Sequence, residues 1–295
     1  MSEYTSITII YNPNSTGSGK KLAADLKKTL ASVVPKHNVE LLQTEHAGHG
    51  ETLAYDLAIA SKRALVISAS GDGGYHDVVN GLMRAQAEGA KPVAGILPAG
   101  NANDHFKNLH RGDFADAIAG GKHQVIDLLK LTTTIDGQQY TRFAHSYIGI
   151  GLTPQAGREL NKTSLNRLKE AWIITRVLLT VTAVHIKVRG KVRTYDSLIF
   201  SNIGDMSKIL SLSNISEAND GKFEITAFRR RNRLKLIATL FKATTTGIKG
   251  DRQATTYSFT TIHPTLVQLD GEIRTIDAGA KATITIEPRL LSCIV

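Results

Sequence analysis

Residues 64–82 read ALVISASGDGGYHDVVNGL, and this stretch decides the fold of the first half of the chain. The apolar run at 64–69 predicts a buried strand, and it leads directly into the glycine-rich turn SGDGG at 70–74. A helical pattern follows over 77–87. A buried strand, a glycine turn and a helix in this order are typical of a parallel α/β sheet.

The same alternation runs through the first 130 residues, which predicts a parallel sheet with helices on both faces. The first expected helix carries Leu22, Leu26 and Leu30 on one face. The other expected strands are 6–11, 38–43 and 93–97, and the other expected helices are 51–62 and 113–119.

After about residue 130 the pattern changes to strands rich in Thr, Val, Ile and Tyr. We therefore predict a doubly wound α/β domain over 1–129 and a mostly antiparallel β-sandwich over 130–295. We leave open whether the last residues of the chain belong to the first domain instead. The expected strands are 139–148, 184–193, 195–202, 222–228, 254–262 and 265–269, with helices at 164–183 and 232–245.

Charge divides along the chain in the same place. The 295 residues carry a net charge of +10, from 36 basic and 26 acidic side chains. Residues 1–130 hold 13 of each sign, so all of the excess lies in residues 131–295, with 23 basic and 13 acidic side chains. The second half should therefore face an anionic partner, such as a membrane surface, a phosphorylated substrate or nucleic acid. No nucleic-acid recognition motif supports the last of these.

Cysteine content and hydropathy narrow the class of protein. The single cysteine, Cys293, excludes an internal disulfide framework and a cysteine-based zinc site, which favours the reducing cytoplasm. We expect no signal peptide at the N-terminus. The most apolar long stretch, 171–188, contains Arg176 and His185 and is too short to span a bilayer.

Three glycine-rich turns follow expected strands, at 12–20, 70–74 and 98–104. The carboxyl ends of parallel strands lie at one edge of a sheet, so these turns should share one crevice. Glycine lets a backbone approach a phosphate, and a following helix offers unpaired N–H groups. The Walker A and GxGxxG patterns are both absent, so neither of those nucleotide motifs explains the turns.

Acidic residues in two turns have both a functional and a structural interpretation. Asp72 could order magnesium beside a nucleotide triphosphate, or cap a helix that begins within 73–77. Asp270-Gly271-Glu272 could supply a catalytic carboxylate, or form a type I′ hairpin turn.

Four segments together resemble the diacylglycerol kinase catalytic-domain family, and its soluble bacterial lipid kinases in particular. They are IIYNPNSTGSGK, SGDGGYHDVVNGL, GILPAGNANDHF and VQLDGEI, the last at 267–273. The resemblance implies an N-terminal domain similar to NAD kinases that binds ATP, and a C-terminal β-sandwich that binds the lipid. It also implies a role in lipid metabolism and phospholipid biosynthesis.

The resemblance also implies roles for individual residues. Glu272 or its neighbour Asp270 falls where the family has its catalytic acidic group, and Asp72 would organise Mg²⁺. A structural metal site would use Asp220 with backbone oxygens of Glu217 and Lys222. The implied nucleotide contacts are Asn12, Thr44, Ser70, Gly71, Asp72, Gly73, Gly74, Asn101, Asn103 and Asp104.

The sequence departs from the family pattern at phosphate-binding positions. Gly74 and Asn101 stand where the family has threonine, and DMSKILSLS at 205–213 replaces a glycine cluster. The expected function is ATP- and Mg²⁺-dependent phosphorylation of a lipid alcohol, with diacylglycerol as the first candidate. The alternatives are a kinase for a sphingoid base, phosphatidylglycerol or a soluble alcohol, and a catalytically weak regulator that binds nucleotide or lipid.

The acceptor side is expected to lie in the basic half. The segment 164–186 reads either as an amphipathic helix over the second sheet or as the entrance to a lipid pocket, and RRRNRLK at 229–235 either as a solvated face or as a contact for anionic lipid. These features predict a cytoplasmic enzyme peripheral to the inner face of the membrane, with a homodimer left open. His46 and His49 lack metal-ligand spacing and are expected in a loop, facing solvent or phosphate.

Overall fold

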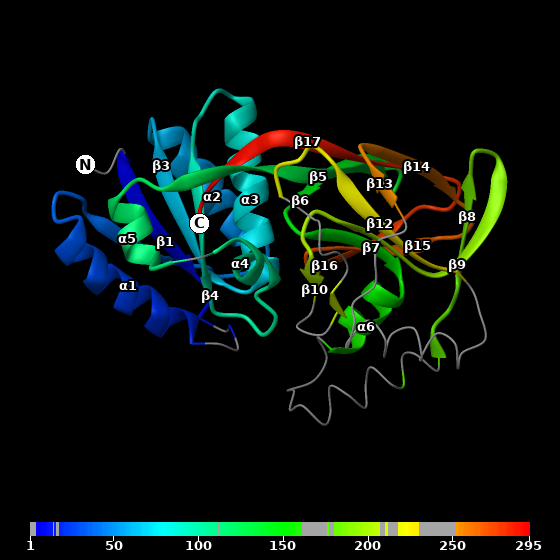
Figure 1. Ribbon diagram of the computed structural model, residues 1–295, viewed down its shortest axis with the longest axis horizontal. Coiled ribbons are helices and arrows are strands. Elements are labelled where there is room, and N and C mark those ends of the chain that lie inside the picture. Colours follow the sequence, from blue (N-terminus) through cyan, green and yellow to red (C-terminus); the bar gives the residue numbers. More distant parts are fainter. Residues whose placement is uncertain are drawn as a thin grey trace. The chain divides into compact units, whose positions relative to one another are not determined.

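A computed structural model of the chain describes residues 4–13, 15, 18–110, 112–160, 176, 180–206, 210–211, 218–229 and 252–295. The chain divides into two compact units. Unit 1 comprises Met1–Asp127 and Arg289–Val295, and unit 2 comprises Leu128–Pro288. Figure 1 shows the elements of both units.

Unit 1 is built on a parallel sheet whose strands pair in the order β2-β1-β3-β4-β17. Its buried strands read as apolar runs because helices cover both faces of the sheet. The first four strands are β1 (Ser6–Tyr11), β2 (Val39–Gln43), β3 (Ala64–Ser70) and β4 (Val93–Pro98), joined at the edge by the end of β17 (Lys281–Ile294).

Helices α1 and α5 lie on one face of this sheet, and α2 and α3 lie on the other (Figure 1). The amphipathic helix expected around Leu26 and Leu30 is confirmed, since both side chains are buried against the strands. The short helix α4 was not expected from the sequence. The five helices are α1 (Gly19–Val33), α2 (His49–Ala60), α3 (Asp72–Ala87), α4 (Asp104–Leu109) and α5 (Phe114–Ala119).

Unit 2 consists mainly of antiparallel strands around one hydrophobic core, in which Phe200 packs on Phe223 and Tyr257. The expected fold class is confirmed: an α/β protein with parallel N-terminal and antiparallel C-terminal strands. The described elements that lie wholly in unit 2 are β6 (Gln138–Ala144), β7 (Tyr147–Gly151), α6 (Leu152–Leu160), β8 (Val184–Val188), β9 (Lys191–Ser201), β10 (Asp205–Met206), β11 (Leu210–Ser211), β12 (Phe223–Arg229), β13 (Arg252–Ala254), β14 (Thr256–Thr261), β15 (Thr265–Leu269) and β16 (Glu272–Ile276).

Two long strands pass from one unit to the other along the chain. The boundaries after Asp127 and Pro288 fall inside β5 (His123–Ile135) and β17. Within unit 1, the backbone N–H of Arg289 donates to the buried Asp127 carboxylate at 2.7 Å. Gln86 donates to the Leu290 carbonyl at 3.0 Å, so the C-terminal segment is tied into unit 1 at two points.

Several expected boundaries were wrong. The strand expected at 139–148 is two strands, β6 and β7, separated at 145–146. The chain reverses between β8 and β9 at Arg189-Gly190, inside the strand expected at 184–193. The strand expected at 254–262 is likewise divided into β13 and β14, and β5, β16 and β17 were not expected as strands.

Other expectations fall largely or wholly outside the described residues. These are the helices at 164–183 and 232–245, most of the basic run at 229–235, and part of the segment 205–213. Among the described residues, no helix combines the length and the hydropathy that a membrane span requires.

Candidate functional site

The candidate site in unit 1 is a pocket of about 240 Å³ at the carboxyl ends of the parallel strands. The strand order reverses between β1 and β3, because the connection from β1 leads to β2 on one side and the chain then returns to β3 on the other. Open α/β sheets bind ligands at such a reversal. The pocket is lined by Ile10, Asn12, Thr44, Glu45, His46, Ala47, Gly50, Ser68, Ser70, Gly74 and Asp77.

Four of the residues expected to contact nucleotide therefore line one pocket. Asn12 directly follows β1, Thr44 directly follows β2, and Ser70 ends β3, so three strand ends bring their side chains together. The backbone N–H of Thr44 donates to the Tyr11 carbonyl at 2.9 Å, which extends the pairing of β1 and β2 up to the pocket. The nucleotide contact itself stays a prediction for these residues.

Gly74 lies in the first turn of α3, one turn after Ser70, and its lack of a side chain has a steric reason. A Cβ at Gly74 would lie 2.5 Å from Oγ and 2.7 Å from Cβ of Ser70. The Ser70 hydroxyl contacts the Ser68 hydroxyl at 2.7 Å and donates to the Gly71 carbonyl at 3.0 Å. The family has a threonine at the position of Gly74. In this chain the Ser70 hydroxyl lies where the side chain of that threonine would begin.

The second and third glycine turns touch through their backbones. A Cβ at Gly71 would lie 2.9 Å from the Cα of Gly100, and a Cβ at Gly100 would collide with the Cα of Gly71. Asn103 closes the third turn: its Oδ1 accepts from the N–H of Gly100 and its Nδ2 donates to the carbonyl of Gly100, both at 2.9 Å. Glycine is required at 71 and 100 because no side chain fits between the two turns.

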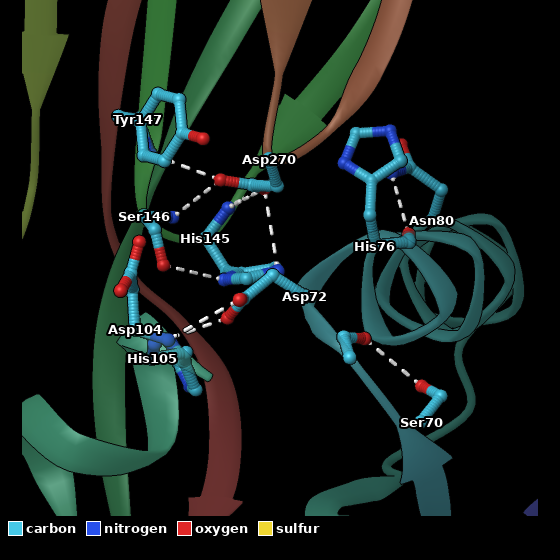
Figure 2. Close-up of polar contacts among 11 residues, drawn as sticks. Ser70, Asp72, His76, Asn80, Asp104, His105, His145, Ser146, Tyr147 and Asp270 are labelled. Carbon is cyan, nitrogen blue, oxygen red and sulfur yellow. Dashed lines mark hydrogen bonds and ion pairs between the residues drawn. The ribbon is translucent and has the colours of Figure 1, made fainter. Parts of the chain in front are cut away.

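Asp72 is the first residue of α3, five residues earlier than the helix expected at 77–87. Its carboxylate accepts the backbone N–H of Asp104 and of His105, each at 3.2 Å (Figure 2). These are the first two N–H groups of α4. The expected structural role, a cap on its own helix, is therefore wrong, because Asp72 satisfies orphan donors of a different helix.

The other expected contacts lie beside the pocket rather than on its lining. Asn101 is exposed, Asp104 is buried in the first turn of α4, and Gly73 is exposed in the first turn of α3. The pocket also includes side chains that the sequence did not single out, notably Ser68 and Asp77. Ser68 precedes Ser70 on the same face of β3, and Asp77 is one turn beyond Gly74, so their period-2 and helical spacing could have identified both.

The loop after β2 also contributes to the pocket. His46, expected to face solvent or phosphate, lines the pocket and stacks on His49, with ring centroids 4.8 Å apart and planes 13° apart. The backbone N–H of Glu45 donates to Nδ1 of His49 at 3.1 Å, which orients that ring. His46 is exposed at the pocket, whereas His49 is half-buried and begins α2 rather than lying in a loop.

In unit 2, Asp270 and Gly271 form the two-residue turn between β15 and β16. Both have positive φ, 47° and 111°, which matches the expected type I′ hairpin. The Asp270 carboxylate is buried and accepts the backbone N–H groups of His145, Ser146 and Tyr147 at 2.7 to 2.9 Å (Figure 2). Asp270 therefore fixes the backbone at residues 145–147, where β6 ends and β7 begins.

Glu272 lies two residues further, at the start of β16, with a side chain that is 17% exposed. Its Oε1 accepts from Nε of Arg274 at 2.7 Å, and Oε2 lies 3.6 Å from Nε of Arg142. Burial by itself would lower the pKa of Arg274, but the Glu272 carboxylate and Tyr140 together raise that pKa above its ordinary value. Burial, and then Glu272, raise the pKa of nearby Tyr140 to about 12. This cluster is a second candidate site.

The expected structural metal site is described only in part. Asp220 is exposed, and its Oδ1 accepts the backbone N–H of Lys222 at 2.9 Å across a turn that contains Gly221. Glu217 lies outside the described residues. In the described part of the chain, no group of three or more His, Cys, Asp or Glu side chains is arranged to hold a metal ion.

The sequence is similar to proteins of one known family. Residues 6–131 match the family model for the diacylglycerol kinase catalytic domain. The diacylglycerol kinase of Bacillus subtilis is 29% identical over 261 residues, which cover 82% of this chain and 78% of that protein. The diacylglycerol kinase of Staphylococcus carnosus is 39% identical over 136 residues, 42% of this chain and 40% of that protein. The expected resemblance to this family is confirmed.

Solved structures agree on the fold. A crystal structure of a diacylglycerol kinase from Bacillus anthracis superposes with a TM-score of 0.71 at 18% identity, covering 100% of this chain and 98% of that one. A putative diacylglycerol kinase from the same organism gives a TM-score of 0.72 at 19% identity, with the same coverage. At this identity the likeness concerns the fold of the whole chain.

Proposed function

We propose, from the diacylglycerol kinase catalytic domain of residues 6–131, that this protein is a lipid kinase that transfers the γ-phosphoryl group of ATP to the hydroxyl of diacylglycerol. The product would be phosphatidic acid. Unit 1 would hold the nucleotide and unit 2 the acceptor, while a sphingoid base or phosphatidylglycerol is the alternative acceptor.

The observation that carries this proposal is the pocket at the strand-order reversal of unit 1. Asn12, Thr44, Ser70 and Gly74 come from three separate strand ends and line one cavity. Hydroxyl and amide groups at the N-terminus of α3 suit phosphate oxygens, because the first N–H groups of a helix lack intrahelical partners. Residues 1–130 have no net charge, so backbone N–H donors of this kind would bind the triphosphate in place of a cluster of basic side chains.

Magnesium fits the residues near this pocket. Mg²⁺ in phosphoryl-transfer sites usually takes one or two carboxylates together with phosphate oxygens. The two oxygens of the Asp72 carboxylate accept the backbone N–H groups of Asp104 and His105, each at 3.2 Å, and an ionised carboxylate has about four acceptor sites in all. When bound, the ion would neutralise charge on the transferred phosphoryl group. Asp72 would hold it, while its bonds to α4 keep the carboxylate in one orientation.

Glu272 is the group we propose as general base for the acceptor hydroxyl. Nε of Arg274 donates to Oε1 at 2.7 Å, and Nε of Arg142 lies 3.6 Å from Oε2. The Glu272 carboxylate would take the proton as the hydroxyl attacks phosphorus. Asp270 is already committed to three backbone donors, so we assign it to positioning and not to proton transfer.

The proposal extends to the place of action. A cytoplasmic enzyme whose basic half contacts the anionic inner face of the membrane could reach its lipid without a membrane span, as a monomer or a homodimer. The excess charge of residues 131–295 supports such contact.

The test combines a lipid panel with one matched pair of variants. Purified protein with γ-labelled ATP, Mg²⁺ and dispersed lipids should give labelled phosphatidic acid. Glu272→Gln should lower kcat about 10²- to 10⁴-fold, the usual contribution of a general base, with nucleotide affinity unchanged. Glu287→Gln is the control, since Glu287 is also a unit 2 carboxylate with a cationic partner, Lys130, at 3.3 Å.

Three outcomes would correct the proposal. A labelled product from another lipid would replace diacylglycerol as the substrate. Nucleotide binding without any labelled lipid would indicate a regulator. Equal loss of kcat in both glutamine variants would reject Glu272 as the base.

A further inference from the structure

The hairpin between β8 and β9 carries a cluster of positive charge. Residues 185–193 read HIKVRGKVR, and we call this segment the basic hairpin (Figure 1). It contains four cations and no acidic residue, and all four cations are exposed. Val192, between two of them, is 56% exposed, the highest value among the large apolar side chains of the described residues. The cations are Lys187, Arg189, Lys191 and Arg193.

The turn of the basic hairpin has an unfavourable residue at its tip. Arg189 and Gly190 both have positive φ, 51° and 76°, as a type I′ turn requires. Such turns favour Asn, Asp or Gly at the first position, because other residues are strained there. Two more turns of unit 2 follow that rule, Asp136-Gly137 between β5 and β6 and Asp270-Gly271 between β15 and β16.

Arg189 therefore stands, at a positive φ, where the two other turns have Asp. Local strain that persists at an exposed position is a reason to look for a function there. Replacing Asp by Arg in such a turn adds a cation at the outermost point of a rigid two-stranded ribbon. Lys191 directly follows the turn, so the tip itself carries two cations.

The strand register extends the charge across one face of the sheet. Lys281 of β17 pairs with Thr260 of β14, Thr260 pairs with Lys187 of β8, and Lys187 pairs with Val192 of β9. Residues paired in register point to the same face, so two lysines and the exposed valine share a row. The other face of the hairpin starts with Ile186 in the core and ends with the cations Arg193 and Lys191.

We propose that the basic hairpin docks on an anionic phospholipid surface, with its cations at the headgroups and Val192 in the interface. Lysines and arginines beside an exposed apolar side chain match an interface that is anionic outside and apolar within. Nucleic acid is a poorer match, because residues 185–193 contain no Phe, Tyr or Trp on which a base could stack. The choice of partner rests on the proposed function, since a lipid kinase must reach a lipid in a membrane.

The decisive variant is Arg189→Asp, which gives the turn the same Asp-Gly pair as the two other hairpins. Its melting temperature should be unchanged or higher, so lost binding cannot be attributed to unfolding. Its binding to phosphatidylglycerol–phosphatidylcholine vesicles, measured by co-sedimentation, should be about 30-fold weaker, from two charge units at about 1 kcal/mol each. Lys91→Asp, an equal charge change at an exposed residue just before β4 in unit 1, should change binding less than twofold.

The variant Val192→Thr distinguishes binding to a membrane from binding to a polyanion such as DNA. It keeps a β-branched residue, and it should weaken vesicle binding several-fold while leaving the binding of a duplex DNA probe unchanged. Equal vesicle binding by Arg189→Asp and Lys91→Asp would overturn the proposal, as would a loss of DNA binding alone in Arg189→Asp. Kinase activity on detergent-dispersed lipid reports the proposed function separately: Arg189→Asp should retain it.

Discussion

At the scale of single residues, two carboxylates of the β15–β16 hairpin have different surroundings, Asp270 in the turn and Glu272 at the start of β16. Asp270 is buried and gives both oxygens to backbone N–H groups, whereas Glu272 is partly exposed and lies between two arginines. A buried carboxylate that accepts three N–H bonds stabilises the chain around it, whereas a partly exposed carboxylate can be reached by an acceptor hydroxyl. We therefore infer a division of roles between neighbours that the sequence treats as equivalent.

Asp270→Ala should lower the free energy of unfolding by about 3 kcal/mol or more, because it leaves three buried N–H groups without acceptors. Asp270→Asn should cost less, since Oδ1 alone accepts from Ser146 and Tyr147. Urea denaturation of the two variants measures the difference. Equal destabilisation by Ala and Asn would contradict this account of the turn.

Local sequence rules identified residues of the first site but not their exact partners. Asn12, Ser70 and Gly74 were expected at one edge of the sheet because their glycine turns follow the ends of parallel strands, and Thr44 was implied by the family resemblance. The α4 donors of Asp72 could not be foreseen, because they lie 32 and 33 residues away and belong to a six-residue helix without a periodic pattern. The close approach of the Ser70 side chain to Gly74, which excludes a side chain at 74, also depends on the geometry of the turn and could not be predicted from the sequence.

At the scale of elements, helices α2 and α3 pack closely at Gly81. A Cβ there would collide with the carbonyl oxygen of Glu51 and lie 3.0 Å from the Cβ of Ala54. Two helices that approach this closely allow no larger residue at the contact without moving apart.

Gly81→Ala should therefore destabilise the protein by about 1–3 kcal/mol, the usual cost of overpacking, although alanine is the better helix former. Thermal or urea unfolding gives the value. Gly112→Ala is the control, because its added Cβ would meet nothing within 4 Å and should be close to neutral. A more stable Gly81→Ala variant would show that α2 and α3 can separate without cost.

Element boundaries were misjudged where the turn or the helix start has atypical residues. The reversal at Arg189-Gly190 was missed because the alternation of apolar and polar residues continues through it and Arg is rare in such turns. Helix α3 was expected at 77 because Gly73 and Gly74 are poor helix formers. Its true start at Asp72 is set by the tertiary structure, where the residues after β3 must turn beside Gly100.

At the scale of the whole molecule, the C-terminal strand completes the sheet of unit 1. Cys293 of β17 pairs with Ala94 of β4 across almost two hundred residues of chain. Its side chain is 1% exposed, and burial raises the pKa of the thiol to about 12.

This raised pKa predicts how stability changes with pH. The unfolded thiol ionises near its ordinary pKa of 9, while the folded thiol stays protonated, so its contribution is complete below pH 9 and is lost between pH 9 and about 12. In that window the wild type should lose up to about 1.4 kcal/mol per pH unit more than Cys293→Ala. Free energies of unfolding against pH test this, and equal slopes would contradict it.

The sequence by itself determined the α/β class, the change from parallel to antiparallel strands near residue 130, and the turns that line the pocket. It did so because apolar periodicity and glycine turns are local signals that act through the backbone of a few neighbouring residues. Only the tertiary structure decided the return of residues 289–295 to unit 1, the three donors of Asp270 and the ion pair of Glu272 with Arg142. Each of these joins groups far apart in the chain, and long-range packing and the burial of polar groups leave no mark on the sequence around either partner.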